Sequence, residues 1–122
     1  MLTNALSVAE AYLRTWNETD ADRRDSALLR DWTDRASYVD PLMTGEGPRE
    51  IGALVAAVHE RFPGFRFRLL GTPDGHGDVA RLRWSLGPAE GEAPIEGSDV
   101  IRLSDGRIDQ VIGFIDKAPP AA

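Results

Sequence analysis

The hydrophobic period of this chain changes once, near Phe65, and this change restricts the possible folds more than any other feature. Before Phe65, apolar residues recur every three or four positions, which is typical of amphipathic helices. After it, apolar and polar residues alternate, which is typical of half-buried strands. The turns between the later segments are too short for parallel crossovers, so we expect mostly antiparallel strands. The sequence therefore predicts an α+β domain with helices on one face of a curved sheet.

The first two helices are expected before a short strand. Thr3 or Asn4 can cap the first helix, and Tyr12 borders its apolar stripe. Asp22 can cap a short second helix, whose apolar side includes Trp32. The apolar stripe of the first helix consists of Leu2, Leu6, Ala9, Leu13 and Trp16.

A strand at 36–40, a loop at 41–47 and a third helix come next. Pro48 suits the first turn of that helix, and the Pro-Gly pair at 63–64 ends it. Its apolar stripe consists of Ile51, Leu54, Val55, Val58 and Phe62. Four strands are then expected near 65–69, 79–86, 97–103 and 108–115, with turn-rich loops at 71–77 and 87–94 and a tight hairpin at 104–107.

Composition and charge bound the class of protein. The chain has 122 residues, enough for one domain, which we expect to span 1–122 with a flexible tail at 117–122. It has no cysteine, which excludes disulfides and thiolate chemistry. The formal net charge of −6 argues against nucleic acid and anionic membranes as partners. Without a recognisable signal or a run of roughly 20 apolar residues, a cytoplasmic location is expected.

Three polar residues interrupt the apolar pattern where chemistry could reside. Asp99 shares strand parity with Ile101 and Leu103, which should face the core, so its carboxylate must find donors or become protonated. Asp40 ends a strand just before an apolar loop, although Asp before Pro is also common in plain turns. Tyr12 lies on the buried side of the first helix, where a tyrosine also serves simply as packing.

The sequence gives no indication of a metal or organic cofactor. Its two histidines, His59 and His76, lie far apart, and neither is accompanied by a cysteine. No glycine-rich phosphate loop and no nucleophile elbow is present. His59, at the edge of the third helical stripe, could reach a pocket, while the glycines and aspartates around His76 indicate a turn. We therefore expect no metal and no cofactor.

The order and spacing of these features resemble the NTF2-like superfamily, in particular its SnoaL-like and ketosteroid-isomerase-like branch. The resemblance extends from about Ala9 to Asp116. It rests on the first helix with its tyrosine and closing Asn-Glu-Thr-Asp, on the Asp-Pro element at 40–41, and on the strand at 97–103 that carries an aspartate. It implies a cone-shaped fold, with three N-terminal helices packed on a curved, mostly antiparallel mixed sheet.

The resemblance to ketosteroid isomerase also implies roles for three residues. In that enzyme, an aspartate base moves a proton next to a carbonyl, while a tyrosine and a protonated aspartic acid stabilise the enolate oxygen. By position, Asp40 matches the base, Tyr12 the tyrosine donor and Asp99 the protonated donor. The implied activity is proton transfer α to the carbonyl of a hydrophobic compound bound in a conical pocket.

The expected pocket differs from that of the isomerase. Val55 replaces a supporting tyrosine and Leu54 an aromatic residue, so a steroid is not the expected substrate. The side chains expected to bind a small hydrophobic molecule are Trp16, Met43, Leu54, Val58, His59 and Trp84.

Three alternatives stay open from the sequence. The same acid and base could drive the aldol closure of a polyketide cyclase. The chain could instead be a non-catalytic ligand-binding or dimerisation module, in which Tyr12 and Asp99 only satisfy each other. An epoxide hydrolase would need an Asp-Arg-Asp relay, and the parity of Arg102 opposes that of Asp99.

The resemblance also implies a homodimer formed through the outer face of the sheet. The residues expected on that face are mixed rather than apolar: Arg66, Arg68, Arg81, Arg83, Val100 and Val111. Planar guanidinium groups pair with carboxylates and stack on aromatic rings, which suits such an interface.

Overall fold

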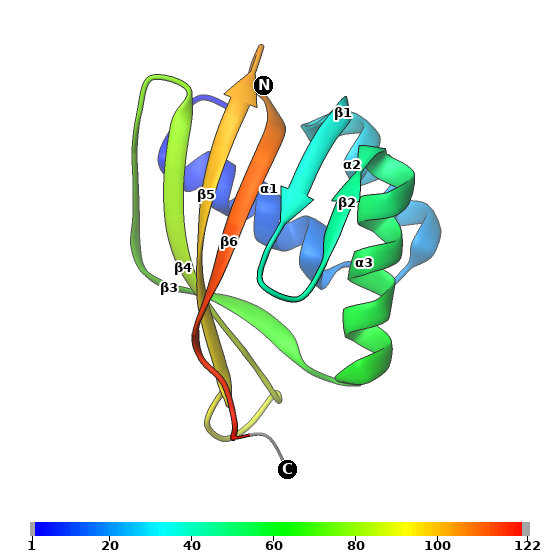
Figure 1. Cartoon of the computed structure of the whole chain (residues 1–122), viewed down its shortest axis with the longest axis vertical. Helices are drawn as coiled ribbons and strands as arrows, with labels where there is room; N and C mark the ends of the chain where they lie inside the picture. Colours follow the sequence, from blue (N-terminus) through cyan, green and yellow to red (C-terminus); the bar gives the residue numbers. More distant parts are fainter. Residues whose placement is uncertain (1, 121–122) are drawn as a thin grey trace.

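The computed structural model describes residues 2–120 and has the predicted α+β architecture. Two helices, α1 (Ala5–Asn17) and α2 (Ala21–Asp31), precede β1 (Trp32–Val39), β2 (Thr44–Glu46) and α3 (Gly47–Arg61). Four strands then follow: β3 (Arg66–His76), β4 (Val79–Gly87), β5 (Ile95–Ser104) and β6 (Arg107–Lys117). In Figure 1, α1 runs behind the curved sheet and α3 lies beside its β1–β2 end.

The six strands form one mixed sheet in the order β2-β1-β6-β5-β4-β3. Every neighbouring pair is antiparallel except β1 and β6, which are parallel. The last four strands form the predicted meander, and β1 joins it at β6. The predicted mixed and mostly antiparallel sheet is therefore confirmed.

Local sequence explains how the helices begin and end. The Asn4 side chain accepts a hydrogen bond from Ser7 N–H and Ser7 reciprocates, which forms a capping box for α1. Asp20 caps α2 through Arg23 N–H, so the prediction that Asp22 is the cap was wrong by two residues. Leu6 was expected in the apolar stripe but is 51% exposed, because α1 turns that side of its first turn toward solvent.

Several strands begin or end at residues other than those predicted. Trp32 begins β1 rather than extending α2, and β2 lies inside the predicted loop at 41–47. The predicted loop at 71–77 is mostly strand, because β3 resumes pairing with β4 after an irregularity between Leu70 and Asp74. Lys117 is the last residue of β6 and not part of a tail. The rest of the predicted tail is exposed at 118–120, and 121–122 lie outside the described residues.

Strand β6 changes parity within its length. An irregularity in its pairing with β5 separates Ile108 from Gln110, so Ile108 and Val111 both face the core. Val111 was predicted on the outer face and is fully buried. Ile112 and Phe114 are exposed in its place. The bulge therefore also turns Gly113 toward the interior, where the candidate site lies.

Candidate functional site

A cavity of about 570 Å³ lies between the inner face of the sheet and helices α1 and α3. Its walls are mainly apolar and aromatic, with Trp16, Phe67 and Trp84 packed edge to face or tilted against one another. Residues 118–120 and Leu42 also line it. Its polar side chains are Tyr12, Tyr38, Asp40, Arg61 and Asp99. Because two aspartates line it, we refer to it as the acid-lined cavity.

Asp99 is placed by strand register. It lies opposite Leu82 on β4 and Gly113 on β6, so its side chain enters the core with a residue exposure of 1%. The Tyr12 hydroxyl donates to Asp99 Oδ2 at 2.5 Å, and Trp84 Nε1 donates to the same oxygen at 3.1 Å. Asp99 Oδ1 is buried and has no hydrogen-bond partner among the described residues. One oxygen thus receives two donors and the other receives none.

Burial dominates the acidity of this pair. It raises the pKa of Asp99 to about 6, the two donated hydrogen bonds oppose the rise, and the charges of Asp40 and Asp116 add to it. Burial together with the charge of Asp99 also raises the pKa of Tyr12 well above its usual value. Tyr12 therefore stays protonated, while Asp99 exchanges its proton at about pH 6 and is mostly ionised at neutral pH.

Asp40 also accepts a hydrogen bond from a tyrosine, but its environment differs from that of Asp99. The Tyr38 hydroxyl donates to Asp40 Oδ2 at 2.6 Å. Oδ1 accepts the backbone N–H groups of Leu42 and Met43 at 2.8 and 2.9 Å. The side chain thereby fixes the turn that follows β1, as expected for Asp before Pro, and the same carboxylate lines the cavity.

Gly113 is the point at which the two tyrosine–aspartate pairs meet. A Cβ atom built on it would lie 2.7 Å from Asp99 Oδ1, 3.2 Å from Asp40 Cβ and 3.5 Å from the Tyr38 hydroxyl. Any larger residue would therefore force these groups apart. The absence of a side chain at this position lets both carboxylates occupy one floor of the cavity.

The structure brings most of the predicted site residues together. Tyr12, Asp40 and Asp99 all line the cavity, as do Trp16, Met43, Val58 and Trp84. Leu54 and His59 do not. Leu54 packs toward Gly45, and His59 Nε2 lies 2.6 Å from the carbonyl oxygen of Trp16. Because a carbonyl only accepts, Nε2 carries the proton, and His59 ties α3 to α1.

Sequence reasoning missed Tyr38 and Gly113. Tyr38 has the same strand parity as Asp40, which is a sequence signal that both side chains face one side of the sheet. Gly113 carried no signal, because the bulge in β6 that turns it inward depends on pairing with β5. Trp16 Nε1 is a further buried donor without a partner among residues 2–120.

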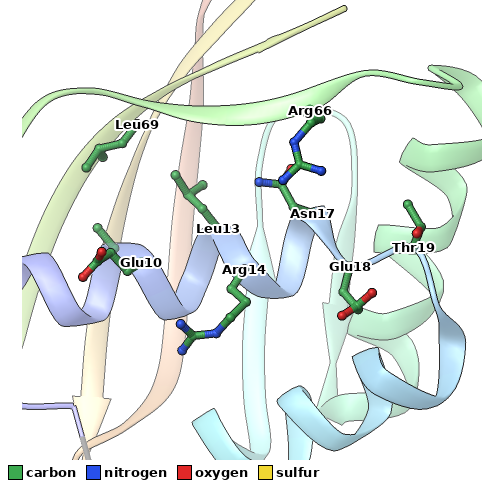
Figure 2. Close-up of a pocket in the computed structure, with 9 residues that line it drawn as sticks. Glu10, Leu13, Arg14, Asn17, Glu18, Thr19, Arg66 and Leu69 are labelled. Carbon is green, nitrogen blue, oxygen red and sulfur yellow. The ribbon is translucent and has the colours of Figure 1, made fainter. Parts of the chain in front are cut away.

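A second cavity, of about 550 Å³, lies on a neighbouring side of α1, between that helix and β3. Figure 2 shows Glu10, Arg14 and Glu18 on or just after α1, and Arg66 across from them on β3. The Asn17 amide donates to the carbonyl of Phe67 at 2.9 Å and accepts its N–H at 2.7 Å. Asn17 thus bonds β3 as a neighbouring strand would, and this hollow shares only Leu13 with the acid-lined cavity.

The fold and the acid-lined cavity define the class of protein: an NTF2-like α+β domain whose cavity opens between a curved sheet and its helices. Residues 9–111 match the SnoaL-like domain family, and the chain belongs to that family. No curated protein matches the chain. None of the described helices is long and apolar enough to cross a membrane. Within residues 2–120, no three His, Cys, Asp or Glu side chains cluster as metal ligands would.

Solved structures extend this comparison. A proposed isomerase of the SnoaL-like family from Agrobacterium tumefaciens str. C58 shares 46% identity and a TM-score of 0.88, covering 92% of this chain and 97% of its own. A proposed SnoaL-like polyketide cyclase from Jannaschia sp. CCS1 has 18% identity and a TM-score of 0.71, with 98% of both chains covered. A proposed ketosteroid isomerase from Kribbella flavida DSM 17836 has 17% identity and a TM-score of 0.69, covering 95% of this chain and 82% of its own. At such low identity, the last two support the fold alone.

Proposed function

We propose that this protein binds a hydrophobic carbonyl compound in the acid-lined cavity and transfers a proton α to the carbonyl. Asp40 is the base that takes the proton, and Tyr12 with Asp99 stabilises the oxyanion that forms. A cavity of about 570 Å³ suits a small molecule, and its mainly apolar lining favours an apolar one. The 46% identical relative, described as a proposed isomerase, supports the same reaction class.

The observation that carries this proposal is the convergence of a base and a donor pair at Gly113. Two carboxylates stand on one cavity floor in different surroundings, one bonded by turn N–H groups and one buried against a tyrosine and a tryptophan. Groups of one type in unlike environments commonly divide acid and base roles between them.

The hydrogen bonds of Tyr12 determine how the donor pair must work. The single hydroxyl hydrogen of Tyr12 points to Asp99 in the ligand-free protein, so it cannot also serve a ligand. If Asp99 takes up a proton on Oδ2, it can donate to the Tyr12 oxygen and free the Tyr12 hydrogen for the oxyanion. Because the pKa of Asp99 is about 6, we expect ligand binding at neutral pH to take up one proton.

Exchange of the α-protons of a bound cyclic ketone with deuterated water, followed by NMR, tests the assignment. We expect Asp40→Asn to slow exchange by about 10²- to 10⁴-fold, the range of general base catalysis. Asp22→Asn is the matched control, because Asp22 is exposed on α2 and should leave the rate unchanged. Equal rates for wild type and Asp40→Asn would overturn the role of Asp40. Binding of the ketone without any exchange would indicate a non-catalytic ligand-binding module.

We further propose that two copies pair through the outer face of the sheet. Val39, Val100, Ile112 and Phe114 are exposed hydrophobic residues there, and register aligns Val39, Ile112 and Val100 across three strands. Arg83 and Lys117 border this patch and both reach Glu96. Sedimentation analysis should find a dimer in wild type and a monomer in Phe114→Glu, with unchanged circular dichroism. A monomeric wild type would overturn this pairing.

A further inference from the structure

Tyr38 has no role in the proposed proton transfer, although among the described residues its hydroxyl is the only side-chain group that hydrogen-bonds to Asp40, the proposed base. It is 4% exposed, lines the same cavity, and donates to Asp40 Oδ2 at 2.6 Å. Its ring packs on Trp16 with 5.3 Å between the ring centres, so the hydroxyl is held in place. Burial, together with the charges of Asp99 and Asp40, raises the pKa of Tyr38, which therefore remains a donor at all ordinary pH values.

A count of lone pairs shows why this bond matters. An ionised carboxylate accepts about four hydrogen bonds, two on each oxygen. Leu42 and Met43 N–H occupy both sites of Asp40 Oδ1. Tyr38 occupies one site of Oδ2 and leaves one free among the contacts of the described residues. A proton that Asp40 takes from a substrate must therefore arrive on Oδ2, next to the Tyr38 hydroxyl.

We propose that Tyr38 is the positioning residue of the base: its hydroxyl and the two turn N–H groups fix the Asp40 carboxylate so that one lone pair of Oδ2 faces the substrate. This inference rests on the proposed function and deepens it. In the step itself, the substrate C–H bond breaks and an Oδ2–H bond forms. The C–H electron pair moves into the enolate, and Tyr38 keeps its own proton.

The same bond favours the return of the proton. A hydrogen bond to an ionised carboxylate is stronger than one to a neutral acid, so Tyr38 stabilises Asp40 before the transfer more than after it. The protonated base therefore gives its proton back more readily, which an isomerisation requires at its second carbon. The Tyr12 hydroxyl donates to Asp99 in the same way, which provides a matched comparison.

The first experiment needs no turnover and compares Tyr38→Phe with Tyr12→Phe, each with ¹³C-labelled aspartate. In Tyr38→Phe, the carboxyl signal of Asp40 should titrate about one pH unit higher than in wild type, from the loss of one charge-assisted bond. In Tyr12→Phe, the Asp99 signal should move up instead, and that of Asp40 by much less. Unchanged titration of Asp40 in Tyr38→Phe would overturn the proposal, whether or not the protein is an enzyme.

The second experiment uses ketone exchange. In Tyr38→Phe, the acid limb of the pH profile of kcat/KM should move upward with the Asp40 signal, and the plateau rate should fall about 10-fold from poorer alignment. Incorporation of 3-fluorotyrosine at position 38 supplies a hydroxyl donor that is more acidic than that of tyrosine. The rate should then match that of wild type, and the acid limb of the kcat/KM profile should lie at a lower pH than in wild type. This variant keeps the test valid if Tyr38→Phe folds poorly. Loss of rate with an unmoved limb in both variants would leave Tyr38 a packing residue and would overturn the proposal.

Discussion

The two tyrosine–aspartate pairs on the cavity floor contain the same functional groups, but the chain builds them differently. Tyr38 and Asp40 lie two residues apart at the end of β1, and a local turn supplies two further donors. Tyr12 and Asp99 are 87 residues apart and meet only when α1 packs on the sheet. The first carboxylate is half-buried and surrounded by donors, whereas the second is buried, and one of its oxygens has no partner among residues 2–120. Solvation and donor number, rather than residue type, separate the proposed base from the proposed acid.

After the loss expected for Asp40→Asn, the largest expected effect concerns the acid. Asp99→Ala should lower the rate of ketone exchange by about 10²- to 10³-fold, because Tyr12, the donor to the oxyanion, then loses the hydrogen bond that the protonated acid gives to its oxygen. Because Asp99 must hold a proton to act, the wild-type rate should decline as pH rises through about 6, the pKa of Asp99. The variant should lack that decline, which a pH profile of kcat/KM measures because kcat/KM reports the pKa of the ligand-free protein. A wild-type rate that climbs steadily between pH 6 and 8 would contradict the assignment of Asp99 as acid.

The next effect is on stability and needs no ligand. The folded protein raises the pKa of Asp99 from 3.8 to about 6, so between these values the folded state holds a proton that the unfolded state has released. The free energy of unfolding should therefore fall as pH rises through this window, by roughly 3 kcal/mol in total. Urea titrations at pH 4.5 and 7.5 should show about 2 kcal/mol of this loss in wild type relative to Asp99→Asn, because the unfolded carboxyl is already largely ionised at pH 4.5. A difference between the two proteins that does not change with pH would rule out the burial effect.

A smaller effect tests whether the two pairs share one floor. Gly113→Ala places a methyl group 2.7 Å from Asp99 Oδ1 and should destabilise the fold by about 1 to 3 kcal/mol. In an Asp99→Ala background the clashing oxygen is gone, so the same substitution should cost clearly less. This double-mutant cycle isolates the contact. Equal costs in both backgrounds would mean that the floor tolerates a side chain.

The smallest expected effect distinguishes the donors of the deep pair. Trp84→Phe keeps an aromatic wall but removes the N–H group that donates to Asp99 Oδ2. That bond opposes the effect of burial, so its loss should raise the pKa of Asp99 further, by about one unit. A ¹³C titration measures the change, and the Asp40 signal serves as the internal control. An Asp99 signal that titrates at the wild-type pH would assign the opposing effect to Tyr12 alone.

Much of this architecture could be predicted because it depends on local patterns. The stripe of α3, the alternation in β4 and β5 and the hairpin at 104–107 each encode their element within a few residues, and all are present. Strand parity alone placed Asp99 in the core. The strands that were missed or mispredicted, β2 and the end of β3, lack a hydrophobic alternation and exist because a neighbouring strand supplies hydrogen bonds.

The sequence by itself determined the α+β class, the inward direction of Asp99 and Tyr12 and the turn at Asp40, since each follows from periodicity or from adjacent residues. Only the tertiary structure decided that Tyr38 bonds Asp40 inside the cavity, that His59 is bound to a backbone carbonyl, and that Gly113 faces inward after a bulge. These features depend on register between strands and on the packing of helices that are distant in the chain. A period in the sequence specifies which side of an element is buried, but the partner that side meets depends on the whole fold.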